Sequence, residues 1–368
     1  MYQFLKLIHG QSKVVQILEK IVSSKQIPHA FLFTGPQNVG QHFTARQFLK
    51  SIIITDETEQ SVELKIDKLE DPFIKYVIPL PRGRGETPDD KPYSKLSAND
   101  LEHIALEFKE KSDNPYYEIK IENANNIKIN SIRDIKKNLS INYGDLRYRM
   151  IIVEDAHLMS IAAQNALLKS LEEPPEGIIF VLITHKPEFL LPTIYSRCWD
   201  IIFTSLSNDV LEEILVTKFN VENSIASEIS PFAEGSIHSA IELFNHGFHQ
   251  ITDLSINIIR YSLGRRYNTA INLFHNGIAE YSKDIIPIIL TLMISWFNDV
   301  QKHRTGIEQF HFTKHADTIE KFNLKFSDSE IDEIVFALHG LKNKLDFNIN
   351  LNLIVLNTIF KIASIGIR

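Results

Sequence analysis

The sequence predicts a parallel α/β sheet domain built around a phosphate-binding loop, followed by a small helical lid and an all-helical C-terminal domain. A strand-like run, a loop with two spaced glycines and a helical stretch follow one another at residues 29–49. Apolar runs of strand length then alternate with helical patterns up to residue 203, the order of a doubly wound parallel sheet. Beyond residue 251 only helical periodicity remains. The expected domains are 1–204, with an insertion at about 56–114, then 205–248 and 249–368.

Each element follows from the spacing of apolar residues and from what interrupts it. Residues 11–25 show helical spacing that Pro28 ends, and Met150–Val153 is a continuous apolar run typical of a central parallel strand. The expected strands are 29–34, 118–121, 150–153, 178–184 and 199–203. The expected helices are 11–25, Phe43 to Leu49, 96–111, 131–139, 162–173, 210–219, 224–232 and 236–244.

The bulk composition narrows the class of protein. A net charge of −7, from 39 basic and 46 acidic residues, gives no general bias toward nucleic acid, although a local basic face is compatible with it. The single cysteine, Cys198, excludes an internal disulfide framework and a four-cysteine zinc site. The N-terminus lacks the pattern of a secretion signal, and the most apolar run, 285–297, is shorter than a membrane span. These features predict a cytoplasmic protein.

Residues 35–42, Gly-Pro-Gln-Asn-Val-Gly-Gln-His, keep the glycine frame of a phosphate-binding loop but lose its chemistry. Gly35 and Gly40 occupy the frame positions, while Gln41 replaces the lysine that reaches the phosphates. His42 replaces the Ser or Thr whose hydroxyl holds Mg²⁺, a cation that prefers oxygen. Taken alone, this motif favours an ordinary glycine-bearing turn between a strand and a helix over a phosphate loop.

An acidic pair, Glu154-Asp155, ends the apolar run at 150–153. In a nucleotide hydrolase this position supplies a metal ligand and a base that positions water, usually in the order Asp then Glu. The order is reversed here, so either Asp155 still binds something or the pair is simply solvated.

A set of further motifs follows in a fixed order along the chain. They are Ile8-x-Gly10-Gln11, His29–Phe33, the helix end Leu171-Glu172-Glu173-Pro174-Pro175, Thr184 at a strand end, Ser196-Arg197-Cys198 and Gly235–Ala240. Together they resemble the clamp-loader branch of the AAA+ family, over roughly residues 5–245. The helical tail is similar by architecture only, and the resemblance implies that it forms an oligomerisation collar.

Within that family the chain resembles the delta-prime group of bacterial DNA polymerase III subunits more than the ATPase subunits. Gln41, His42, Glu154 and His238, the last at the sensor-2 position, each replace a residue that contacts nucleotide or metal. The resemblance implies that these residues, with Gly35, Gly40, Asp155 and the sensor-1 residue Thr184, form a degenerate nucleotide site. No independent hydrolysis and no bound cofactor are therefore expected.

Arg197 is retained, and the resemblance assigns it the role of an arginine finger acting on the γ-phosphate of a neighbouring subunit. Its planar, permanently charged fork suits phosphate, although a surface salt bridge would also account for it. The implied partners are tau/gamma-type ATPase subunits and a delta-type subunit, with the sliding clamp and primed DNA reached through the complex. Two alternatives are an active AAA+ ATPase and a pseudo-ATPase that acts outside replication.

The insertion departs from the family pattern. Many members carry a four-cysteine zinc module before the acidic strand, whereas this chain has no cysteine there, so no zinc is expected. The Pro-, Gly- and charge-rich residues 79–90 predict an exposed, mobile loop, in which Arg82 and Arg84 could contact DNA or a partner. His311 and His315 share helical spacing, but no third ligand accompanies them.

Overall fold

The computed structural model describes residues 3–54, 60–70, 72–139, 147–281, 283, 285–307, 310–345 and 350–365. The chain divides into two compact units, one of Met1–Val210 with Gly235–His238 and one of Leu211–Glu234 with Ser239–Arg368. The expected three-part division at residues 204 and 248 stays a prediction. Among the described residues, no helix has both the length and the apolar character needed to cross a membrane.

The first unit is built on a parallel sheet, as the sequence predicts. In the described residues five strands lie in the order β2-β3-β4-β1-β5, and every pair is parallel. The strands are β1 (Ala30–Thr34), β2 (Ile74–Val77), β3 (Arg149–Val153), β4 (Ile178–Thr184) and β5 (Trp199–Ile202). Their carboxyl ends meet at one edge, because Thr34 of β1 pairs with Thr184 of β4 and Val153 of β3 pairs with Leu182 of β4.

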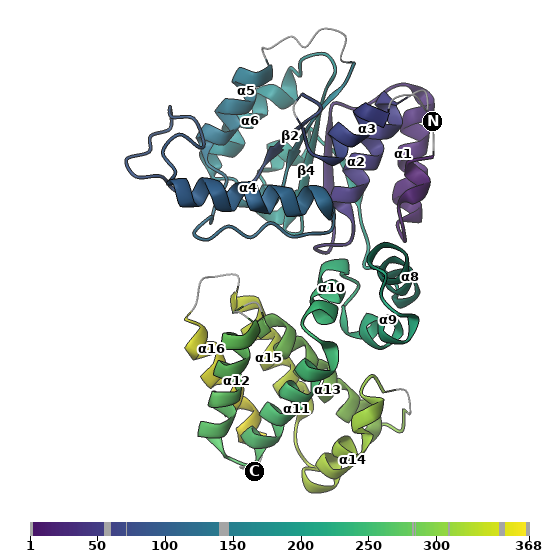
Figure 1. Ribbon diagram of the computed structural model, residues 1–368, viewed down its shortest axis with the longest axis vertical. Coiled ribbons are helices and arrows are strands. Elements are labelled where there is room, and N and C mark those ends of the chain that lie inside the picture. Colours follow the sequence, from purple (N-terminus) through teal and green to yellow (C-terminus); the bar gives the residue numbers. More distant parts are fainter. Residues whose placement is uncertain are drawn as a thin grey trace. The chain divides into compact units, whose positions relative to one another are not determined.

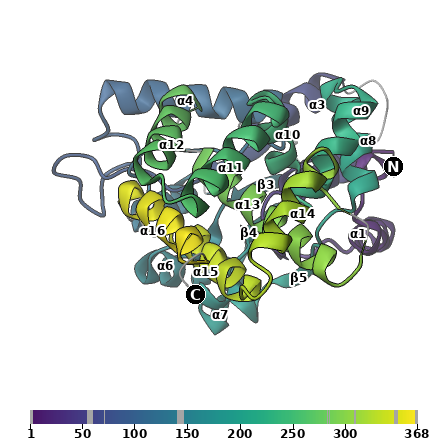
Figure 2. The ribbon, with the colours of Figure 1, turned by 90° about the horizontal axis from the view of Figure 1, so that it is seen from below.

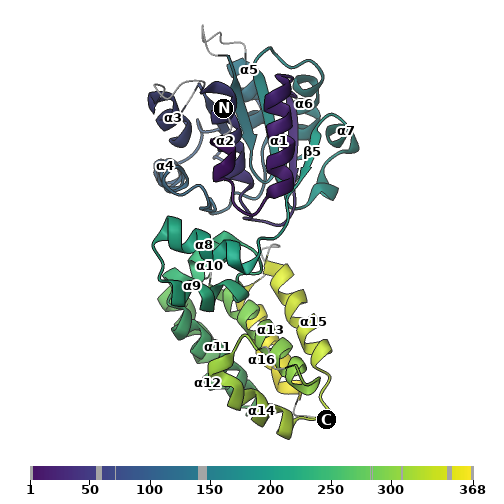
Figure 3. The ribbon, with the colours of Figure 1, turned by 90° about the vertical axis from the view of Figure 1, so that its right-hand side faces the viewer.

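Helices cover both faces of this sheet. They are α1 (Ser12–Ser24), α2 (Gln41–Ile53), α3 (Gln60–Asp67), α4 (Ala98–Asp113), α5 (Ile129–Leu139), α6 (Ile161–Glu172) and α7 (Pro192–Tyr195). Alternate residues of β1 face opposite ways: Leu32 joins the core beneath α5 and α6, while Phe31 packs edge-on against Phe48 of α2. Figure 1 shows α5 and α6 on one side of the sheet, and Figure 3 looks onto α1 and α2.

The second unit is helical, as expected. It takes in most of α8 (Asn208–Phe219) and α10 (Ile237–Asn245), and α9 (Asn223–Ile229), α11 (Phe248–Leu263), α12 (Tyr267–Tyr281), α13 (Ile285–Arg304), α14 (Ala316–Lys325), α15 (Ile331–Lys344) and α16 (Leu351–Ser364). The apolar run noted in the sequence, 285–297, forms the first part of α13, where Trp296 and Phe297 are buried. α16 packs beside α11, α12 and α15 (Figure 2). This run is therefore a domain core.

One expectation next to the insertion is wrong. Residues 118–121 form no strand, and the edge strand is β2, inside the segment expected to be an insertion. The backbone N–H of Lys120 is bound instead by the Glu107 carboxylate of α4 at 2.7 Å. The loop at 79–90 is mostly exposed, as expected, and its mobility stays a prediction. Glu86 anchors it, because it accepts from the backbone N–H of Gly83 at 2.7 Å and pairs with Lys128 at 2.7 Å.

Candidate functional site

The glycine frame forms a strained turn between β1 and α2. Gly35 has a φ of 136° and Gly40 a φ of 100°, which residues with side chains rarely adopt. A Cβ on Gly35 would lie 2.4 Å from the carbonyl oxygen of Phe203, so only glycine fits there. Thr34 ends β1 and Gln41 begins α2. The strand–loop–helix context of a phosphate loop is therefore present.

Gln41 fills this loop from within. Its side-chain Nε2 donates to the carbonyl of Pro36 at 2.6 Å, and its Oε1 accepts from the backbone N–H of Val39 at 3.2 Å. The residue is only 5% exposed. A backbone N–H that a phosphate would need is thus occupied by a neutral side chain of the same loop.

His42 is hydrogen-bonded to other side chains of the protein. Its Nε2 lies 2.5 Å from Oε2 of Glu154, and the hydroxyl of Tyr76 on β2 hydrogen-bonds to both residues. Burial, followed by the charges of Lys111 and Arg46, holds the pKa of His42 well below its ordinary value, so the ring is neutral. Burial and then the Glu154 charge raise the pKa of Tyr76. Glu154 is consequently committed to structural hydrogen bonds.

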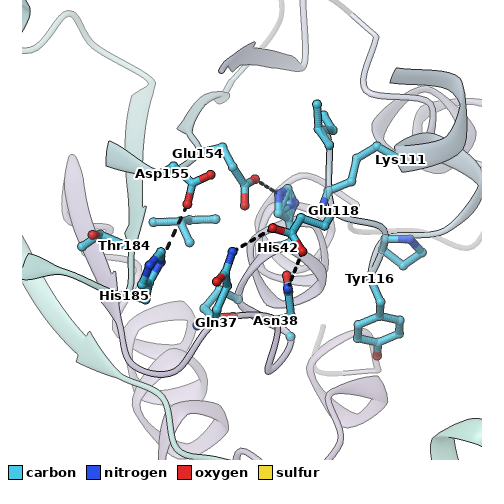
Figure 4. A pocket seen from close by; sticks show the side chains of 15 residues that line it. Gln37, Asn38, His42, Lys111, Tyr116, Glu118, Glu154, Asp155, Thr184 and His185 are labelled. Atoms are coloured by element: carbon cyan, nitrogen blue, oxygen red, sulfur yellow. Dashed lines mark hydrogen bonds and ion pairs between the residues drawn. The ribbon is translucent and has the colours of Figure 1, made fainter. Parts of the chain in front are cut away.

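Glu118 places a second carboxylate across the loop, as Figure 4 shows. It accepts from Nε2 of Gln37 at 2.9 Å and from Nδ2 of Asn38 at 3.1 Å. Nε2 of His238, at the sensor-2 position, lies 3.2 Å from Oε2 of Glu118. Sequence reasoning placed Glu118 in a strand and missed this role, because its partners lie 80 or more residues away.

Asp155 lies two residues after the end of β3, and Thr184 is the last residue of the neighbouring strand β4. Burial, with Glu154 and Glu118 next in importance, raises the pKa of Asp155 to about 8. Oδ1 of Asp155 lies 3.9 Å from Nδ1 of His185 (Figure 4). Thr184 is buried, with 1% of its surface exposed. Its hydroxyl is hydrogen-bonded to Nδ1 of His157 at 3.0 Å and accepts from the backbone N–H of Lys186 at 3.0 Å.

The resulting pocket does not fit a nucleoside triphosphate. Its cavity is about 40 Å³, and three acidic side chains line it, those of Glu118, Glu154 and Asp155. Lys111 also lines the pocket, but its Nζ donates to the carbonyl of Tyr117 at 2.5 Å, and burial lowers its pKa. A triphosphate would meet like charge here and would have to displace Gln41.

Arg197 lies apart from this pocket, in the turn between α7 and β5. Its Nη2 is 2.7 Å from Oε1 of Glu172, the last residue of α6, and its Nη1 donates to the carbonyl of Thr193 at 2.9 Å. The side chain remains one-third exposed. The neighbouring Cys198 packs against the core, and burial raises the pKa of its thiol to about 12. The cysteine is therefore a packing residue.

The structure brings together eight of the nine site residues expected from the sequence: Gly35, Gly40, Gln41, His42, Glu154, Asp155, Thr184 and His238. It adds Tyr76, Lys111, Glu118, His157 and His185, for which no sequence motif gave a signal. His311 and His315 do not share a helix. His311 faces Asp299 at 3.8 Å and His315 faces Asp253 at 3.5 Å, so the expectation that they could face together on a helix is wrong.

Comparison with known proteins identifies the family. A family model described as "DNA polymerase III, delta subunit" matches residues 10–207. DNA polymerase III subunit tau of Bacillus subtilis is 26% identical over 64% of this chain and 36% of its own length. Subunit gamma of Buchnera aphidicola from Schizaphis graminum is 29% identical over 67% of this chain and 59% of its own length. The chain thus spans between about a third and three-fifths of these relatives.

Solved structures are similar at low identity. A DNA polymerase III gamma subunit-related protein of Thermotoga maritima is 16% identical, with a TM-score of 0.44, over 95% of this chain and 99% of that one. The Thermotoga maritima RuvB Holliday junction branch migration motor is 13% identical, with a TM-score of 0.42, over 83% and 87%. The family match covers more than half of the chain, and the chain therefore belongs to the clamp-loader family of DNA polymerase III subunits.

Proposed function

We propose that this chain is a non-hydrolysing, delta-prime-type subunit of a bacterial DNA polymerase III clamp loader, acting in the cytoplasm. In this role it is a stator within a hetero-oligomeric ring that loads the sliding clamp onto primed DNA. The observation that carries the proposal is the Gln41 side chain, which bonds within its own phosphate loop at 2.6 and 3.2 Å. These hydrogen bonds occupy groups of the loop that would otherwise contact a nucleotide phosphate.

The chemical part of the proposal is that Arg197 completes the ATP site of an adjacent tau/gamma-type subunit. Three features support it: Arg197 keeps its charge, it is partly exposed, and it is flanked in sequence by exposed apolar side chains. Tyr195 is 43% exposed and Trp199 53% exposed, which suits a protein contact surface. An arginine supplied in trans raises phosphoryl-transfer rates by about 10³–10⁵ in well-studied cases.

A second candidate is an active ATPase subunit, because the similar curated proteins are named tau and gamma. It requires that Gln41 leave the loop, and that a metal bind beside Glu118, Glu154 and Asp155 without a loop hydroxyl. The neutral His42 pair with Glu154 weighs against it.

Reconstituted complexes test the proposal. Complexes with Arg197→Ala should lose ATP turnover at the adjacent site by about 1,000-fold or more, the low end of what trans arginines supply. Arg197→Lys should recover little, because lysine lacks the planar fork. Lys20→Ala on α1, which removes an exposed positive charge elsewhere in the same unit, should leave turnover unchanged. Full activity with Arg197→Ala in an assembled complex would remove the trans role.

A further inference from the structure

Three metal-ligating side chains meet at the carboxyl ends of β3 and β4, outside the phosphate loop itself. Asp155, His157 and His185 are each half-buried, and one ligand atom from each lies within 4.8 Å of the others. Asp155 and His157 follow β3, and His185 follows β4 directly. Since these strands are parallel neighbours, their carboxyl ends bring the three side chains together.

The backbone and a neighbouring hydroxyl orient these ligands. Asp155 holds a left-handed conformation with a φ of 46°, which a residue other than glycine seldom adopts and which often marks a functional site. Nδ1 of His157 is hydrogen-bonded to Thr184 Oγ1, whose own position is fixed by the Lys186 backbone N–H. Metal-binding histidines are generally held in this way through the ring nitrogen that does not bind the metal.

The two imidazole rings already lie against each other and against the carboxylate. The centroids of the His157 and His185 rings are 4.5 Å apart at a steep angle, and Nδ1 of His185 is 3.9 Å from Oδ1 of Asp155. In a tetrahedral zinc site, bonds of about 2.1 Å place ligand atoms about 3.4 Å apart. Small rotations of the histidine rings about their soft terminal torsions, moving the ring nitrogens by about 1 Å, would bring the ligand atoms to this separation.

We propose that Asp155, His157 and His185 form a binding site for a divalent first-row transition metal, with Zn²⁺ the best fit. Two imidazoles and one carboxylate suit zinc, whereas Mg²⁺ and Ca²⁺ take oxygen ligands. The adjoining cavity of about 40 Å³ leaves room for a water as fourth ligand. Glu154 takes no part, because it is bound to His42 and Tyr76.

Zinc titration of the full chain tests the site. The protein is freed of metal with a chelator and titrated with Zn²⁺ by calorimetry, and with Co²⁺ by visible absorption. We expect one ion per chain, an affinity at least about tenfold weaker in His185→Ala, and a smaller loss in Thr184→Val, which removes only the orienting hydroxyl. Zn²⁺ should raise the melting temperature of the wild type but not that of His185→Ala.

The matched control is His315→Ala, which removes a histidine that faces Asp253 at 3.5 Å in the other unit. It should bind Zn²⁺ like the wild type. No zinc binding, equal weakening by His185→Ala and His315→Ala, or equal competition by Mg²⁺ would overturn the proposal. His185→Gln, checked by circular dichroism, replaces His185→Ala if the smaller side chain unfolds the protein.

Discussion

At the phosphate loop, polar side chains bind one another, whereas in the turn before β5 Arg197 keeps its charge partly in solvent. Gln41 and His42 are each 5% exposed and satisfied by Pro36, Val39 and Glu154. Arg197 is held by an exposed carboxylate, a main-chain carbonyl and the Ser196 hydroxyl at 3.4 Å. The same unit thus contains a loop whose polar side chains are buried and hydrogen-bonded to one another, and a partly exposed arginine. Substitution of Gln41 or His42 should therefore lower the stability of the fold, whereas substitution of Arg197 should affect the interaction with partner subunits.

The largest expected difference between the two regions is in stability. His42→Ala removes a buried ring and its bonds to Glu154 and Tyr76, and should lower the free energy of unfolding by about 2–3 kcal/mol. Arg197→Ala breaks an exposed ion pair and should change it by less than about 0.5 kcal/mol. Urea unfolding of the first unit measures both. Similar losses in the two variants would break the comparison.

The buried, neutral His42 should also make the free energy of unfolding fall as the pH is lowered. Its folded-state pKa is lowered by burial, so below about pH 6.5 the unfolded chain binds a proton that the folded chain does not. Stability from this group is therefore lost as the pH falls from 7 to 5, by up to about 2 kcal/mol. His42→Gln should flatten this part of the curve in urea unfolding at the two pH values. An unchanged slope would contradict a buried neutral histidine.

A smaller effect is expected from the carboxylate across the loop. Glu118→Gln removes a negative charge beside Gln37 and Asn38 and should strengthen binding of inorganic pyrophosphate by at least about tenfold. Glu122→Gln, an exposed acid of the same segment, is the matched control and should have no effect. Calorimetry compares the three proteins. Equal affinities would show that Gln41 alone closes the loop.

The smallest effect concerns the ion pair of Arg197. Glu172→Gln should free the guanidinium for a partner's phosphate and raise ATP turnover of the reconstituted complex by about two- to fivefold, the range of an exposed ion pair. Glu173→Gln, the next acid in the chain, serves as control. A fall in turnover with Glu172→Gln alone would mean that the carboxylate positions Arg197 for its task.

Four of the strands were predicted from the sequence, at 29–34, 150–153, 178–184 and 199–203, and the signal was clearest where the run is apolar. β3 and β4 are buried on both faces, so their runs identify them without neighbours. β2, Ile74–Val77, has four residues at the sheet edge inside a Pro- and charge-rich region, and only its pairing with β3 reveals it. The alternating residues 118–121 mislead, because no strand lies beside them and α4 binds their backbone instead.

The site was predictable to the extent that it lies on motifs. Gly35 and Asp155 follow recognisable strands, and Gly40 lies directly before helix α2; parallel pairing brings such strand ends together. The hydrogen-bond partners of His42 and Asn38 could not be predicted, because they lie far apart in the sequence and meet only in the folded domain. Tyr76 reaches His42 across 34 residues and Glu118 reaches Asn38 across 80. The sequence therefore shows which contacts were lost but not which contacts replaced them.

The most direct test of the account is Mg²⁺-ATP binding and hydrolysis by the isolated wild-type chain, measured by calorimetry and phosphate release. The account predicts neither binding heat nor turnover, because Gln41 occupies the loop and three carboxylates line the pocket. Micromolar binding with turnover would contradict it and would make the chain an ATPase that uses Asp155 and the glycine frame.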